Sequence, residues 1–213
     1  DYVTAIDWQF VCRSRGILDV GYFIGLDLDP ARTAVLVVDM LNDFVDPKGL
    51  MPLEHGDGLF EPHRRLLAAA RSSGARVIWV CDTHAPDDRE FDKRAVHCLT
   101  GTWGAAIPEA LGARDDEERV FKRRYSGFFE TDLDLRLRER NIRHLVVTGV
   151  VTNICVRSTC HDAFFRGYDV IVPPECVMAT GEREQASSLY DIDTHYGTVA
   201  SLDDVLAALG RRA

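Results

Sequence analysis

Acids, a lysine and a cysteine that could act together on a carbonyl group follow apolar runs of this sequence. Asp39 and Asp82 each end such a run, Lys122 ends another, and Cys155 comes shortly after a fourth. An ammonium group favours a thiolate by its charge, and a carboxylate can take the thiol proton. The backbone N–H groups of Val151 and Cys155 could hold the resulting oxyanion. These residue types predict attack of the thiol on a carbonyl, with a structural ion pair beside an inert thiol as the alternative.

The segment around the cysteine predicts a β-α-β unit. Residues 145–151 form a continuous apolar run with β-branched side chains, which is typical of a strand buried on both faces. Thr152 and Asn153 are residue types that begin helices, and the run 170–172 supplies the second strand. Cys155 is therefore expected in the first turn of a helix, where backbone N–H groups stabilise a thiolate. In open α/β sheets, ligands bind in this same crevice.

Strand-like and helix-like segments alternate along the chain. The predicted strands are 34–40, 76–81, 119–123, 145–151, 170–172 and 198–201, and the predicted helices are 59–73, 105–111, 132–140, 154–167, 182–196 and 202–209. This alternation predicts a three-layer α/β fold with a mostly parallel, Rossmann-like sheet between two layers of helices. The predicted domain covers residues 31–213, and residues 1–30 are expected to form an N-terminal arm or extension. The carboxyl ends of the strands share one edge of such a sheet, so the acids, the lysine and the cysteine should meet there.

Composition restricts the partners and the location. The chain has 213 residues, 46% of them hydrophobic, and a formal net charge of -9. This charge argues against nucleic acid or an anionic membrane as the main partner. No apolar run approaches the length of a membrane span, and no secretory signal is visible. The six cysteines are scattered and do not form a disulfide framework, so a reducing, cytoplasmic location is expected.

Three longer motifs resemble a known family. They are VVDMLNDF around Asp39, VFKRRYSGFFETDL around Lys122 and VTGVVTNICVRSTCHDAFFRGY around Cys155. In this combination the chain resembles the isochorismatase-like cysteine hydrolases and, within them, the nicotinamidase-like amidases. The resemblance implies that Cys155 is the nucleophile, Asp39 the general base and Lys122 the third member of the triad. It also implies a cis peptide bond between Val150 and Val151, a homo-oligomer (dimer or tetramer), a small-molecule amide substrate and no organic cofactor.

A further segment is similar to the metal-binding segment of nicotinamidases. It contains Asp82, His84 and His97. A carboxylate and two imidazoles can hold Zn²⁺ or another divalent metal and leave positions open for water or a ring nitrogen. Hydrogen bonding within the loops is the alternative role for these side chains. A further ligand histidine that nicotinamidases carry between the two histidines is missing from this chain.

Four other residues are predicted to bind the substrate. Phe44 and Tyr125 are expected as pocket walls, with core packing as the alternative. Arg94 stands where nicotinamidases commonly carry a tryptophan, and it could bind a substrate carboxylate or remain a solvated charge. Asn153 stands where nicotinamidases usually carry an acid, which is similar to the ureidoacrylate amidohydrolase branch.

These features favour a cysteine-dependent amidohydrolase that cleaves the C–N bond of a small carboxamide or carbamoyl substrate through a thioester and releases ammonia. Nicotinamide is the first substrate to consider. The alternatives are a ureidoacrylate or N-carbamoyl amidohydrolase, and isochorismatase proper, which cleaves a vinyl ether without a cysteine nucleophile. Two non-enzymatic alternatives are disfavoured. A receiver domain needs an acidic pair near its first strand and a phosphoacceptor after its third, and a silent scaffold would not need the intact Asp39, Lys122 and Cys155 set.

Overall fold

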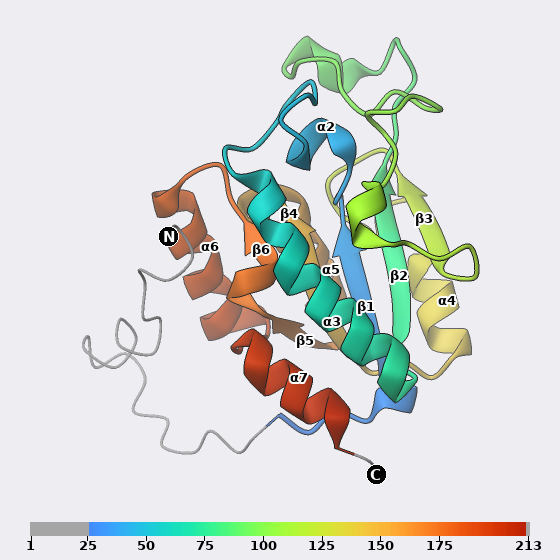
Figure 1. The fold of residues 1–213 in the computed structure, drawn as a ribbon, viewed down its shortest axis with the longest axis vertical. Helices are drawn as coiled ribbons and strands as arrows, with labels where there is room; N and C mark the ends of the chain where they lie inside the picture. Colours follow the sequence, from blue (N-terminus) through green and yellow to red (C-terminus); the bar gives the residue numbers. More distant parts are fainter. Residues whose placement is uncertain (1–25, 212–213) are drawn as a thin grey trace.

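The computed structural model describes residues 26–211 and contains one parallel sheet (Figure 1). Its strands are β1 (Thr33–Val38), β2 (Arg76–Asp82), β3 (Glu118–Lys122), β4 (His144–Val150), β5 (Asp169–Val172), β6 (Val177–Met178) and β7 (Thr198–Val199). Their order is β3-β2-β1-β4-β5-β7, and the short β6 pairs with the end of β4. Every pairing is parallel, so the carboxyl ends of the strands share one edge, as the sequence predicts.

Helices cover both faces of this sheet. They are α2 (Asn42–Val45), α3 (Phe60–Ser73), α4 (Leu133–Glu139), α5 (Arg157–Phe165), α6 (Glu182–Asp191) and α7 (Leu202–Gly210). In Figure 1, α3 and α7 lie in front of the sheet. The predicted three-layer α/β fold is confirmed. Within the described residues no helix is long and apolar enough to cross a membrane.

The core follows from the period of two along a strand. Val35 and Val37 of β1 pack in the apolar layer that includes residues of α3 and α7. Ala34, Leu36 and Val38 pack in the opposite layer, with residues of α4, α5 and α6. Because successive side chains of a strand point to opposite faces, an unbroken apolar strand needs helices on both sides.

Several predicted elements differ in detail. The helix predicted over 105–111 is only a 3₁₀ turn at Glu109–Leu111, which follows Pro108 and ends at Gly112 in the left-handed conformation. The first turn of the predicted helix 154–167 is a π-helical segment, Thr152–Val156, that leads into α5. The predicted helix 182–196 likewise ends in a π-helical segment, Ile192–Tyr196. The two-residue strand β6 was not predicted, because it is too short to show a period.

Two other expectations concern the backbone and the N-terminus. The peptide bond between Val150 and Val151 is cis, as the family resemblance implies. Most of the predicted arm, residues 1–25, lies outside the described residues. Of the described residues that remain, 26–30, the last begins the 3₁₀ turn Pro30–Arg32, and Thr33 then begins β1.

Candidate active site

The strand register brings the chemical groups to one level of the sheet edge. Val38, the last residue of β1, pairs with Gly149 of β4. Asp82, at the end of β2, pairs with Lys122 at the end of β3. Asp39 follows β1 directly, with its backbone N–H donating to a carbonyl of β2. The acids and the lysine therefore lie on three neighbouring strands that end together.

Close contact between β1 and β4 depends on a glycine. A Cβ atom at Gly149 would lie 1.8 Å from the carbonyl oxygen of Val38, and the φ angle of Gly149 is +105°. A side chain at this position would therefore separate the two strands. Asp39 also has a positive φ, 51°, which is uncommon for a residue other than glycine. The backbone thus turns sharply where the carboxylate enters the site.

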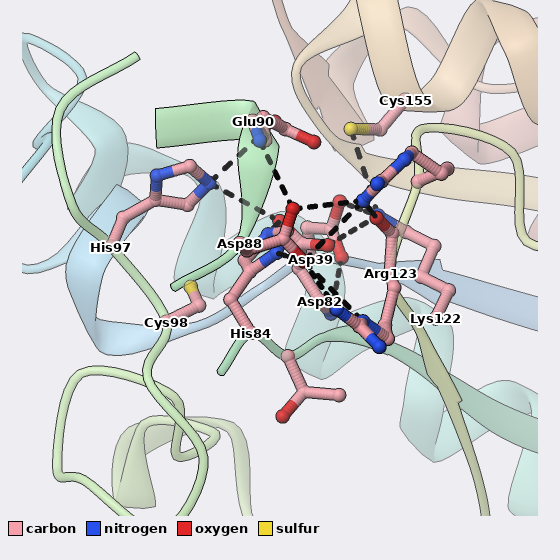
Figure 2. A network of polar contacts seen from close by, with 12 residues as sticks. Asp39, Asp82, His84, Asp88, Glu90, His97, Cys98, Lys122, Arg123 and Cys155 are labelled. Carbon is pink, nitrogen blue, oxygen red and sulfur yellow. Dashed lines mark hydrogen bonds and ion pairs between the residues drawn. The ribbon is translucent and has the colours of Figure 1, made fainter. Parts of the chain in front are cut away.

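Lys122 lies at the centre of a buried polar network (Figure 2). Its Nζ lies 2.8 Å from Oδ2 of Asp39 and 3.2 Å from Oδ1 of Asp82. The same Nζ lies 3.8 Å from Sγ of Cys155. Oδ1 of Asp39 accepts the backbone N–H of Asp82 at 2.8 Å. One ammonium group therefore holds two carboxylates and touches the sulfur.

Burial and charge set the protonation states of this network. Burial raises the pKa of Asp39 to about 6, against the opposing effect of Lys122. Burial also raises the pKa of the Cys155 thiol well above its ordinary value, although Lys122 lowers it. Burial lowers the pKa of Lys122, but Asp39, Cys155 and Asp82 together outweigh burial and hold that pKa well above its ordinary range. The resting site therefore contains a thiol, a carboxylate and an ammonium group, and Asp39 titrates close to neutral pH, as suits a proton shuttle.

Cys155 is held by the segment between β4 and α5. The N–H of Val156 donates to the carbonyl of Val151 at 3.3 Å, a bond that spans five residues and defines the π-helical turn. The Thr159 hydroxyl donates to the carbonyl of Cys155 at 2.7 Å. That hydroxyl also accepts the N–H of Gly127 at 3.0 Å, which ties the turn after β3 to the cysteine. The sulfur is thus positioned through its own backbone.

The three predicted metal ligands lie together and are buried. Ligand atoms of Asp82, His84 and His97 all lie within 4.8 Å of one another. Nε2 of His84 and Nε2 of His97 lie 3.1 and 3.4 Å from Oδ2 of Asp82. Nδ1 of His97 lies 2.7 Å from the carbonyl oxygen of Ala95, so this nitrogen donates and Nε2 is left to face the site. The donor set, one carboxylate and two imidazoles, fits Zn²⁺ or a similar divalent ion.

Asp88 supports this cluster and was not predicted from the sequence. Its side chain is fully buried, and Oδ2 lies 3.1 Å from Nδ1 of His84. The guanidinium groups of Arg123 and Arg124 donate to the same carboxylate, which links the loop after β2 to the residues after β3. The pKa of Asp88 is held well below its usual range, first by the backbone N–H of Glu90. A carboxylate on the far nitrogen of a ligand histidine fixes the tautomer that binds a metal.

A cavity of about 380 Å³ opens onto the network. Its lining residues are Asp39, Phe44, Met51, Pro52, Leu53, Glu54, Asp82, Glu90, Arg94, His97, Tyr125, Val150, Val151, Ile154, Cys155 and Thr180. The volume lies within the range of sites for small organic molecules. Apolar and aromatic walls surround a few polar groups, so one small planar ligand could reach the sulfur.

The predicted substrate residues divide into two groups. Phe44, Arg94 and Tyr125 line the cavity, and the Phe44 ring lies 5.4 Å from the His97 ring. Asn153 is not among the lining residues. Its side chain instead donates to the hydroxyl of Thr180 at 3.3 Å, and Thr180 does line the cavity. Asn153 therefore contacts the wall of the pocket rather than its interior.

Glu90 is a further acid of the cavity that the sequence did not single out. Its side chain is only 9% exposed, and Oε1 lies 3.9 Å from Nε2 of His97. It lies between His84 and His97, the interval in which this chain lacks the further ligand histidine that the family resemblance implies. An acid in that interval was the one available signal, but the loop holds several acids and no periodicity distinguishes them.

Asp43 was also missed, and it organises the loops around the cavity. Its carboxylate accepts the N–H of Cys98 at 2.7 Å and that of Leu50 at 3.0 Å. A Cβ atom at Gly104 would lie 2.2 Å from this carboxylate, so the glycine allows the close approach. The loops that follow β1 and β2 are thereby joined, and His97 next to Cys98 is held in place.

Comparisons with known proteins show the family to which this chain belongs. The family model for the isochorismatase domain matches residues 33–204. An isochorismatase-like hydrolase from Alkaliphilus metalliredigens is 34% identical, with a TM-score of 0.80 over 83% of this chain and 98% of that one. N-carbamoylsarcosine amidase from Thermoplasma acidophilum is 31% identical, with a TM-score of 0.74 over 81% and 97%. A nicotinamidase from Bacillus subtilis is 27% identical, with a TM-score of 0.75 over 80% and 99%. The chain therefore belongs to the isochorismatase family of hydrolases.

Proposed function

We propose that this protein is a cysteine-dependent amidohydrolase that cleaves the C–N bond of a small carboxamide or carbamoyl compound and releases ammonia. One observation carries the proposal. Beneath a cavity lined by Asp39 and Cys155, the buried Lys122 ammonium lies 2.8 Å from the Asp39 carboxylate and 3.8 Å from the Cys155 sulfur. An acid, an ammonium group and a thiol in mutual contact are the groups that nucleophilic attack on an amide requires.

The first half of the reaction forms a thioester. Asp39 takes the proton of the Cys155 thiol as Sγ attacks the carbonyl carbon, and Lys122 stabilises the thiolate that develops. The tetrahedral intermediate carries its negative charge on the former carbonyl oxygen, and the N–H groups of Val151 and Cys155 are the donors for it. Protonated Asp39 then gives its proton to the leaving nitrogen. Ammonia departs and the acyl group stays on sulfur.

The second half returns the enzyme to its resting state. Asp39, again a carboxylate, takes a proton from water as the water oxygen attacks the thioester. Collapse of this intermediate breaks the C–S bond, and the sulfur recovers the proton from Asp39. A pKa of about 6 allows Asp39 to be a carboxylate at neutral pH and still an effective acid in the following step.

Asp82, His84 and His97 would hold a divalent metal beside this set. Such an ion supplies a Lewis acid that orients a substrate lone pair or a water molecule. Asp82 contacts both groups, with Oδ1 toward Lys122 and Oδ2 toward the imidazoles. Its charge is therefore balanced from two sides.

Two substrate classes are to be tested first. Nicotinamide is one, because a nicotinamidase is among the similar structures. N-carbamoyl compounds are the other, because N-carbamoylsarcosine amidase is also similar and Arg94 lines the cavity. By analogy with the family, the active form is proposed to be a dimer or tetramer.

An ammonia-release screen tests the proposal. The panel is nicotinamide, pyrazinamide, ureidoacrylate, N-carbamoyl compounds and biuret, each with added Zn²⁺ and with a chelator. Cys155→Ala and iodoacetamide should both abolish turnover, whereas Cys160→Ala, on the buried side of α5, should retain it. Turnover that survives in Cys155→Ala would rule out the covalent mechanism. Cleavage of a vinyl ether without ammonia release would identify isochorismatase chemistry instead.

A further inference from the structure

Arg94 is a charged residue of the cavity that the proposed reaction does not use. It is half-buried and lines the cavity together with Tyr125 and Cys155. Arg94 thus belongs to the same cavity as the nucleophile.

The backbone at Arg94 is anchored. Its N–H donates to the carbonyl of Glu90 at 3.0 Å, at the end of the 3₁₀ turn Arg89–Asp92. That turn is capped by Asp88, whose carboxylate accepts the N–H of Glu90 at 3.0 Å. Because Asp88 is itself fixed by two arginines, the loop presents Arg94 from a defined position.

The guanidinium of Arg94 has no ion-pair partner within the described part of the chain. Among residues 26–211, no carboxylate lies within ion-pair distance of Arg94. By contrast, two other arginines near this loop, Arg123 and Arg124, both form ion pairs with Asp88. Glu90 shares the wall with Arg94 but directs Oε1 toward His97, at 3.9 Å. Lys122 is already neutralised by the two buried carboxylates. Among the described residues that line the cavity, Arg94 is the one lysine or arginine. Its guanidinium therefore remains available to bind a ligand.

A partly desolvated guanidinium without a partner favours a ligand that brings a carboxylate. Its fork of donors matches a carboxylate in a bidentate pair, which is stronger and more directional than a neutral hydrogen bond. Glu54 also lines the cavity, but its side chain is 86% exposed, so solvent screens its repulsion of an anion. The cavity volume of about 380 Å³ leaves room for an amide group at the sulfur and a second polar group at the rim.

We propose that the substrate is a small amide that carries a carboxylate, such as an N-carbamoyl amino acid or the monoamide of a dicarboxylic acid, and that Arg94 binds this carboxylate. The inference rests on the proposed amidohydrolase function and names its substrate class. Arg94 acts as a specificity residue: it holds the end of the substrate remote from the scissile bond, while Cys155 attacks the amide carbonyl.

Matched pairs of substrates test the assignment. The panel consists of N-carbamoylglycine and succinamate, each with its methyl ester, and ammonia release gives kcat/KM. The native enzyme should prefer each acid over its ester by at least about 10-fold, the scale of a charge-assisted hydrogen bond. Arg94→Gln should remove that preference by raising KM for the acids, Arg94→Lys should keep part of it, and both esters should change by less than about 2-fold. Arg89→Gln is the matched control, because this side chain is exposed on the same loop.

Binding to an inactive variant separates the two proposals. In Cys155→Ala, calorimetry should detect binding of the acids, and adding Arg94→Gln should abolish it. If the acids bind but no native turnover is found, the amidohydrolase proposal fails while the carboxylate site stands. If neutral amides are hydrolysed and the acids neither bind nor react, the function stands and the role of Arg94 is refuted. Equal losses for acid and ester in a folded Arg94→Gln protein would also overturn it.

Discussion

Replacement of Lys122 by methionine is the sharpest test of the buried network. The lysine side chain is buried and contacts Asp39 at 2.8 Å and Asp82 at 3.2 Å. Without the ammonium group, Asp39 loses the largest influence that lowers its pKa, while burial continues to raise it. The carboxyl group must then remain charged without a partner or take up a proton.

The expected cost follows from the arrangement of charges. Removal of one partner from a buried ion pair costs about 3–5 kcal/mol of unfolding free energy, because the remaining charge is uncompensated. Asp82 still contacts two imidazoles, so most of the cost should come from Asp39. The double variant Lys122→Met with Asp39→Asn should therefore be more stable than Lys122→Met alone. Ammonia release should be lost in both.

Urea unfolding of the native protein, both single variants and the double variant measures this coupling. The losses of unfolding free energy in the two single variants, added together, should exceed the loss in the double variant by more than about 2 kcal/mol. Independent sites would differ by only about 0.5 kcal/mol. Additive losses, or a Lys122→Met protein as stable as the native one, would refute the reasoning about buried charge. Circular dichroism of each variant confirms that a fold is present to be compared.

Three further predictions concern other parts of the molecule. Gly149→Ala should lower the unfolding free energy by more than about 3 kcal/mol, because its Cβ would lie 1.8 Å from the Val38 oxygen. The control Gly58→Ala, whose Cβ would meet nothing within 4 Å, should change the unfolding free energy by less than about 0.5 kcal/mol. A well-tolerated Gly149→Ala would contradict the strand contact. Burial lowers the pKa of His63 to about 4, below its unfolded value near 6.5, so the unfolded state binds the proton more strongly and stability falls as pH drops through this interval. Between pH 7.5 and 4.5, the native protein should lose about 2.5 kcal/mol more unfolding free energy than His63→Gln, as measured by urea unfolding at each pH. Identical pH profiles of the two proteins would contradict this. Elemental analysis after dialysis should find one divalent ion per native chain and none in His97→Ala, with the exposed His55→Ala as control; equal metal content would exclude the predicted site.

Local sequence patterns were sufficient to predict the helix layers on both faces of the sheet and the strand ends at which Asp39, Lys122 and Cys155 lie. An apolar strand of β-branched residues cannot be covered from one side only, so runs such as 145–151 required helices on both faces. Parallel strands then placed Asp39, Lys122 and Cys155 at one sheet edge without any coordinates. The same period-based reasoning failed for β6 and for the 3₁₀ turn at 109–111, which are too short to carry a period.

Tertiary structure alone decided how the charges are shared. The sequence offered two strand-end acids, and only the contacts showed that Lys122 holds both while Asp82 also faces the imidazoles. The role of Asp88 depends on two arginines that lie 35 and 36 residues further along the chain. Such pairings form through long loops that bring distant residues together, and no local periodicity records them. For this reason residue types could predict which groups meet at the sheet edge, whereas the absence of an ion-pair partner for Arg94 among residues 26–211 could be found only in three dimensions.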